Sequence, residues 1–171
     1  LYDIHNLEDL LARDRFQDHD KESLDMFIDS VKEFADRELF PYVKEMDENP
    51  AYHKDGKVFV HDQVKTMMYK GGEMGLISAP FNYEDGGMQI PFLSHTAATY
   101  ILDAANNHLP GYAGLTQGAA ELIIHFANKE LNQTYVPNML SGQWGGTMCL
   151  TEPQAGSSLS DIVTKATPTQ D

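Results

Sequence analysis

The feature that most constrains this chain is a change of pattern at Gly142. Before it, apolar residues recur at helical spacing. After it, two short runs typical of strands, GQWGGTMCL (142–150) and IVTKA (162–166), flank a loop. Two strands in about 30 residues do not make a stable sheet by themselves. We therefore predict a mostly α fold with three parts: an N-terminal extension (1–20), a helical domain (21–141) and the truncated start of a β-domain (142–171).

The helical part has clear local signals. Asp20 is a good N-cap residue, and Leu24, Phe27 and Val31 follow it at helical spacing. Pro41 is expected to end or kink that helix because proline has no backbone N–H to donate. Lys54-Asp55-Gly56 predicts a turn, and further helices are expected at about 61–74, 92–105, 111–127 and 131–140.

Charge and composition narrow the possible partners. The 171 residues carry a formal net charge of -14, from 12 Lys+Arg against 26 Asp+Glu. Such a surface repels nucleic acid and anionic membranes, so we expect neither as a partner. No apolar run approaches the ~20 residues of a membrane span, and residues 1–20 are too charged for a signal peptide. The single Cys149 excludes an internal disulfide and fits a cytoplasmic location.

The stretch with chemical content runs from Met148 to Ser158, MCLTEPQAGSS. A strand delivers the hydroxyl of Thr151 to its end, Pro153 fixes a turn, and the small residues after it let the backbone approach a ligand. Free amides of small residues can hold a phosphate or the edge of a flavin. On pattern alone, an ordinary strand–turn–strand is an equally good interpretation.

This stretch resembles the LTEPxAGSD signature of the acyl-CoA dehydrogenases. Further segments resemble the same family in the same order, from Asp20 onward: FADRELFPY (34–42), GLISAPFNYEDGG (75–87), GAAELIIHFANKELNQTYVPNMLSG (118–142) and TKA (164–166). The opening YDIHNL resembles the longer bacterial members, which carry an N-terminal extension. One departure is Ser158, which stands where the signature has Asp.

The resemblance implies that FAD is the cofactor and that the motif lies against it. Thr151 would hydrogen-bond the flavin ring, while Met148 and Leu150 would contact the ring face or edge. Gly156 and Ser157 would contact the pyrophosphate, and Ser157 would also reach the CoA moiety.

The implied reaction is α,β-dehydrogenation of an acyl-CoA thioester, with an electron-transferring flavoprotein as the electron acceptor. The resemblance also implies that the enzyme is a homo-oligomer. In the family the base is a glutamate in the C-terminal part, so we assign no catalytic residue here and expect this segment alone to be inactive. The floor of the family's acyl cavity falls on Pro110, Gly114 and Gly118, which share one helix face. Their small size predicts a deep cavity, although the glycines could instead serve close helix packing.

Several alternatives need separate tests. Glu152 could be mistaken for the base, but we interpret it as a carboxylate that hydrogen-bonds loop amides. The seven histidines show no metal-ligand spacing, so no metal site is expected. An acyl-CoA oxidase, or another flavin oxidase of the superfamily, would need the same motif. A non-catalytic relative that binds nucleic acid or a protein is a further alternative, which a Lys/Arg-rich C-terminal part would favour.

Overall fold

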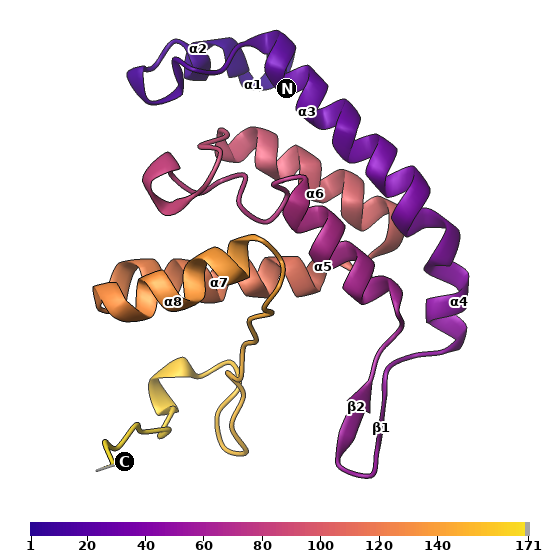
Figure 1. The fold of residues 1–171 in the computed structure, drawn as a ribbon, viewed down its shortest axis with the longest axis vertical. Coiled ribbons are helices and arrows are strands. Elements are labelled where there is room, and N and C mark those ends of the chain that lie inside the picture. The colour runs from indigo at the N-terminus through magenta and orange to yellow at the C-terminus, as the bar shows by residue number, and fades with distance from the viewer. Residues whose placement is uncertain (170–171) are drawn as a thin grey trace.

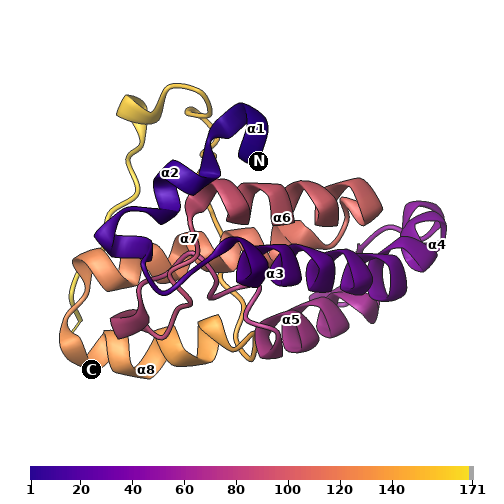
Figure 2. The same cartoon turned by 90° about the horizontal axis from the view of Figure 1, so that it is seen from above.

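The computed structural model describes residues 1–169 and is mostly helical, as the sequence predicts. Five helices build its main layer: α3 (Lys21–Phe34), α5 (Gln63–Glu73), α6 (Phe92–Asn106), α7 (Pro110–Phe126) and α8 (Lys129–Leu140). α3 packs against α6, and α7 packs against both α5 and α8 (Figures 1 and 2). The core between these helices includes Val31, Leu39, Met67, Ile77 and Leu109.

The start of α3 follows directly from its sequence. The side chain of Asp20 accepts a hydrogen bond of 2.8 Å from the amide of Ser23. In return, the Ser23 hydroxyl accepts one of 3.0 Å from the amide of Asp20. This reciprocal pair satisfies two amides that the first helical turn leaves without partners, which confirms Asp20 as the N-cap.

The helix changes form around Pro41 rather than simply stopping there. After α3 the chain widens into a π-helical turn, η2 (Ala35–Leu39). It then tightens into the 3₁₀ turn η3 (Phe40–Tyr42) and continues as α4 (Val43–Glu48). Two buried side chains donate hydrogen bonds to backbone carbonyls of this irregular stretch. Gln63 donates to the Glu38 carbonyl at 2.6 Å, and Asn106 donates to the Leu39 carbonyl at 3.0 Å. The helix therefore changes form where proline removes a donor.

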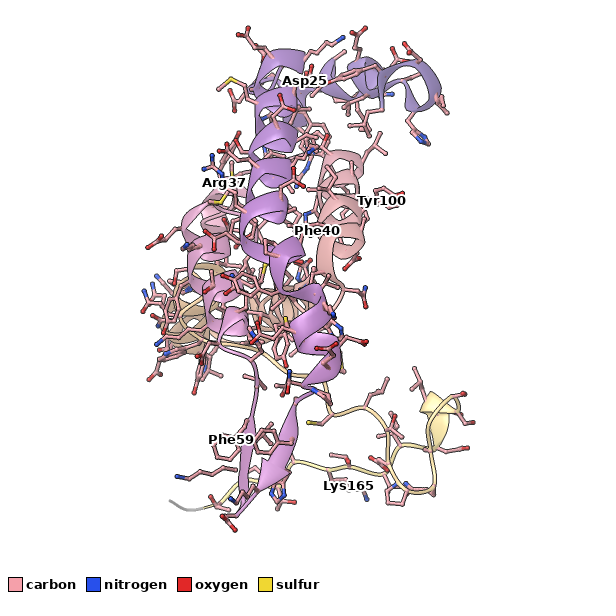
Figure 3. All side chains as sticks on the ribbon, turned by 90° about the vertical axis from the view of Figure 1, so that its right-hand side faces the viewer. Asp25, Arg37, Phe40, Phe59, Tyr100 and Lys165 are labelled. Atoms are coloured by element: carbon pink, nitrogen blue, oxygen red, sulfur yellow. The ribbon has the colours of Figure 1, made fainter. Side chains whose placement is uncertain are left out.

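The turn predicted at Lys54-Asp55-Gly56 belongs to a small hairpin of β1 (Tyr52–Lys54) and β2 (Lys57–Phe59). The strands are antiparallel, with Tyr52 opposite Phe59, and the two rings stack 5.0 Å apart. Asp55 and Gly56 both have positive φ, as the tight hairpin turn requires. The hairpin projects beyond the helical layer; Phe59 lies on it in Figure 3, at the same end as Lys165 of the C-terminal segment.

The N-terminal extension is packed onto the helical layer. It contains α1 (Tyr2–His5), α2 (Leu7–Leu11) and the 3₁₀ turn η1 (Asp14–Phe16). Leu7 is completely buried in a second, smaller core with Leu24, Ala79 and Ile90. Polar contacts tie the extension to the loop 80–91, in which η4 (Tyr83–Asp85) lies: Arg15 donates to the Asn82 side chain, and Gln89 donates to the Arg15 carbonyl at 2.6 Å.

The two strands predicted after Gly142 are not formed. Among residues 142–169, the structure has a single isolated bridge between Glu152 and Ala155 and the 3₁₀ turn η5 (Leu159–Asp161). A strand is defined by hydrogen bonds to a neighbouring strand, and neither 142–150 nor 162–166 has such a neighbour within the described chain. This segment leaves the helical layer after α8 (Figure 1). Within residues 1–169, no helix has the length and apolar character that a membrane span needs.

Candidate functional site

The motif segment is anchored to α7 at Gly146. The Gly146 amide donates a 3.0 Å hydrogen bond to the hydroxyl of Thr116, which is completely buried on α7. A Cβ at residue 146 would lie 2.6 Å from the Cβ of Ala119 and 3.1 Å from the terminal methyl of Met139. Since such distances are shorter than van der Waals contact, only glycine lets the backbone lie this close to α7 and α8.

The loop of the motif is organised around the carboxylate of Glu152. The backbone of Glu152 closes a tight turn with Ala155, through bonds of 2.8 and 3.2 Å. Its side chain accepts from the amides of Val163 at 3.0 Å and Thr164 at 2.9 Å, and also from the Thr164 hydroxyl and the Gln154 amide. These bonds confirm the interpretation of Glu152 as a carboxylate that holds loop amides.

The electrostatics of Glu152 agree with that structural role. The Thr164 hydroxyl and the Val163 amide, which bond to the charged form, lower the pKa of Glu152 to about 2. A general base works best with a pKa near the working pH. Glu152 is therefore unsuited to proton abstraction at neutral pH, and its chemistry is that of a fixed anion.

Around this turn, the motif residues identified from the sequence have exposed side chains and backbone amides without partners in the described chain. Thr151 is exposed, and its hydroxyl has no hydrogen-bond partner within residues 1–169. The side chains of Met148 and Leu150 are likewise exposed, although both are apolar. In the same part of the chain the amides of Gly156 and Ser157 donate no backbone hydrogen bond. The loop thus offers a hydroxyl, two apolar side chains and two free amides.

Pro110, Gly114 and Gly118 lie along α7 beside two neighbouring cavities. An outer cavity of about 290 Å³ lies between the start of α6, the loop at Pro80 and α7, where Gly118 lines it. An inner recess of about 40 Å³ is lined by Pro110 and Gly114 together with apolar residues of α5 and α6. A Cβ at residue 114 or 118 would meet nothing within 4 Å in the described chain. Here, unlike at Gly146, no neighbour requires the absence of a side chain.

Two polar side chains line both cavities, and sequence reasoning missed both. His95 comes from α6 and Gln117 from α7. The Gln117 amide donates to the carbonyls of Leu76 at 3.3 Å and Ile77 at 2.9 Å, in the turn after α5. Neither Gln117 nor His95 has a sequence partner that marks it, since α7 also carries Thr116 and Glu121.

A larger hollow of about 510 Å³ lies elsewhere, between the loop at 84–86 and α8. Its charged lining residues are Glu84 and Asp85, both acidic. Acidic walls disfavour a phosphate-bearing ligand such as a nucleotide or a coenzyme A. The motif loop and the α6–α7 cavities are therefore better candidates for ligand contacts than this hollow.

The same helical layer occurs in known proteins. A family model described as the N-terminal domain of acyl-CoA dehydrogenase matches residues 21–143. A butyryl-CoA dehydrogenase of Syntrophomonas wolfei is 30% identical over 168 residues, which are 96% of this chain and 27% of the relative. The chain thus belongs to the acyl-CoA dehydrogenase family.

Solved structures agree on the fold. A structure of the electron transferring flavoprotein of Acidaminococcus fermentans has a chain that is 28% identical, with a TM-score of 0.62 over 84% of this chain and 35% of that one. An acyl-CoA dehydrogenase of Bacillus anthracis, solved with FAD, is 21% identical, with a TM-score of 0.64 over 85% of this chain and 23% of that one. The chain therefore spans about a third or less of the length of these relatives.

Proposed function

We propose that this chain is the N-terminal part of an FAD-dependent acyl-CoA dehydrogenase, which removes the α and β hydrogens of an acyl-CoA thioester. The observation that carries the proposal is the motif loop, where Glu152 holds a tight turn while the Thr151 hydroxyl and the amides of Gly156 and Ser157 stay free. Buried polar groups of a bound ligand need partners, and this loop offers several in a small space.

The free groups fit a flavin cofactor by their chemistry. Thr151 can donate to or accept from the polar edge of the ring, and Met148 and Leu150 offer apolar contact to its face. The amides of Gly156 and Ser157 can donate to pyrophosphate oxygens without any positive side chain, which suits a protein with a net charge of -14. When bound, the flavin would supply the hydride acceptor. FAD is present in the B. anthracis acyl-CoA dehydrogenase of the same fold.

The substrate side of the proposal rests on α7. Pro110, Gly114 and Gly118 face the two cavities, so an acyl chain can lie along this face of the helix. Ser157 would contact the CoA moiety. Because Gly114 and Gly118 have open space where a side chain would be, the cavity would accept long or bulky acyl groups.

The remaining parts of the reaction would come from outside these 171 residues. The general base would be a glutamate of the C-terminal part, by resemblance to the family, so this segment by itself would not turn over substrate. We propose an electron-transferring flavoprotein as acceptor and a homo-oligomer as the active form. The match to a chain in the A. fermentans electron transferring flavoprotein structure supports that choice of acceptor.

The test uses the full-length protein. We expect a yellow protein with one FAD per subunit that acyl-CoA bleaches without oxygen, and that electron-transferring flavoprotein reoxidises faster than air. Rapid reoxidation by air instead would identify an oxidase. Protein that is colourless and gains no flavin absorbance when FAD is added would refute the proposal.

Chain length provides a second test of the acyl cavity. Gly114→Leu and Gly118→Leu would fill the open face and shift preference towards shorter chains, since each excluded methylene forfeits ~0.8 kcal/mol of burial. Leu115→Ile, which alters an exposed residue of the same helix outside the cavity lining, is the matched control. An unchanged chain-length profile in both glycine variants would show that α7 does not line the acyl site.

A further inference from the structure

His95 and Gln117 stand where the outer cavity meets the inner recess. Both residues line both spaces, one from α6 and one from α7. Apart from these two and the Thr99 hydroxyl, the inner recess is lined by apolar side chains and small residues (Met67, Leu76, Leu102, Pro110, Ala113 and Gly114). A ligand that extends from the outer cavity into the recess must therefore pass between an imidazole and an amide.

The orientation of the Gln117 amide follows from its partners. The carbonyls of Leu76 and Ile77 can only accept hydrogen bonds, so the NH₂ group of Gln117 must face them. The oxygen of the same amide is left without a donor among the described residues. It is therefore an acceptor that a ligand can use.

His95 offers the complementary group. Its ring makes no hydrogen bond within residues 1–169, while its backbone carbonyl accepts from the Thr99 hydroxyl at 3.0 Å. Burial lowers the pKa of His95, so the ring is neutral at pH 7 and carries one N–H donor and one acceptor nitrogen. Glu121 is the acidic residue that lines the outer cavity, and no acidic residue of the described chain lines the inner recess. Because a neutral imidazole supplies no positive charge and Glu121 adds a negative one to the lining, the outer cavity disfavours an anionic ligand tail.

We propose that His95 and Gln117 form a polar subsite in the acyl cavity that selects acyl chains bearing a neutral hydroxyl group. The hydroxyl donates to the Gln117 oxygen and accepts from the His95 N–H, so both unpaired groups gain a partner. An unsubstituted chain at this point leaves both groups desolvated and unpaired, which is the situation that gives a strong preference. A chain that ends in a carboxylate is disfavoured by Glu121 and gains no cation. This inference rests on the proposed acyl-CoA dehydrogenase function.

The experiment compares matched substrates on the full-length, FAD-loaded enzyme. One series has straight-chain acyl-CoA thioesters, the second has a hydroxyl at successive positions beyond the β carbon, and the third ends in a carboxylate. We expect one hydroxyl position to raise kcat/KM on the order of tenfold over the straight chain of equal length. The carboxylate series should be the poorest. Because each hydroxyl lies beyond the β carbon and takes no part in the reaction, the preference should also appear in equilibrium binding of the corresponding enoyl-CoA products.

Variants assign the preference to the subsite. His95→Leu should abolish the hydroxyl preference, and His95→Gln, which keeps a donor and an acceptor, should retain part of it. Thr96→Val is the matched control: Thr96 is exposed on the same helix, and its hydroxyl bonds to the Phe92 carbonyl. Flavin content and thermal unfolding report whether each variant folds, and His95→Gln gives a readout if His95→Leu does not.

The possible outcomes separate the two proposals. Straight-chain turnover with no hydroxyl preference at any position overturns the subsite and leaves the dehydrogenase function standing. A preference that His95→Leu leaves intact also overturns it. If the FAD-loaded enzyme oxidises no acyl-CoA at all, the proposed function fails and the subsite fails with it.

Discussion

Gly114 and Gly146 should respond in opposite directions to the same substitution, alanine. Gly114 lies inside α7 and has nothing within 4 Å of the place where a Cβ would be. Glycine in a helix interior is less stable than alanine by about 0.5–1 kcal/mol, since it loses more backbone freedom on folding. Gly114→Ala should therefore stabilise α7 by about that amount.

Gly146 has no such space. Its added Cβ would lie 2.6 Å from the Cβ of Ala119 and 3.1 Å from the Cα of Thr116, both on α7. Relieving that overlap requires the motif segment to move away from the helix, which breaks the hydrogen bond from the Gly146 amide to Thr116. Overpacking of this kind costs about 1–3 kcal/mol. The two variants should thus differ in sign and by about 1.5–4 kcal/mol.

Amide hydrogen exchange of the full-length protein measures this locally, which matters because a large multidomain protein does not unfold in one step. In Gly114→Ala, amides of α7 should exchange about two- to fivefold more slowly, the factor that corresponds to ~0.5–1 kcal/mol. In Gly146→Ala, amides around Thr116 should exchange faster. If Gly114→Ala also speeds exchange in α7, another part of the protein packs against that glycine. The proposal that this face of α7 is open to an acyl chain would then be wrong. Close packing against that other part would explain the glycine.

Three further changes test other parts of the structure. Leu7→Ala should destabilise the packed N-terminal extension by about 2–5 kcal/mol and expose it to protease, whereas Ile4→Ala, at an 82% exposed residue, should not. The lowered pKa of Glu152 means that its bonds to Val163 and Thr164 hold at neutral pH and are lost only as the pH falls through about 2. Amide chemical shifts of both residues should titrate around that pH, and Glu152→Gln should remove the transition. Thr151→Val in the full-length protein should weaken FAD binding by on the order of 1 kcal/mol in a flavin titration, and unchanged affinity and spectrum would show that Thr151 is not a flavin ligand.

The helical part of the fold could be predicted because its signals are local. Periodic apolar residues placed α6 and α7 within a residue of their observed ends. The cap at Asp20 needs a partner only three residues away. The form of the chain at Pro41 could not be predicted, since the π turn depends on Gln63 and Asn106, which are distant in sequence.

The same distinction explains the errors at strands. The turn at Asp55-Gly56 has a local signal. The strands that pair Tyr52 with Phe59 do not, because both are exposed and show no apolar–polar alternation against a core. For 142–150 and 162–166 the pattern indicates a tendency, and a strand needs a partner to form. A sequence pattern indicates the backbone conformation that a segment prefers, whereas strand formation also requires a neighbouring strand to pair with.

The candidate site shows the limit of motif reasoning as well. The motif pointed to Thr151, Gly156 and Ser157 but gave no indication that residues 163 and 164 would bind the Glu152 carboxylate. Nor did it show that Thr116, 30 residues earlier, would hold Gly146. His95 was missed because a single histidine in a helix is usually an ordinary core or surface residue. Its significance comes from the cavities that it shares with Gln117.

The two halves of the proposed site are held by forces of different strength. The acyl side lies on α7, whose buried face packs into the main core through Ala113 and Ala120. The flavin side depends on hydrogen bonds to one carboxylate that water can reach, and such bonds weaken when water competes for both partners. The motif loop is therefore the half that gains most from a ligand or from neighbouring strands. Binding of FAD should order this loop more than it orders α7, and hydrogen exchange with and without FAD would measure the difference.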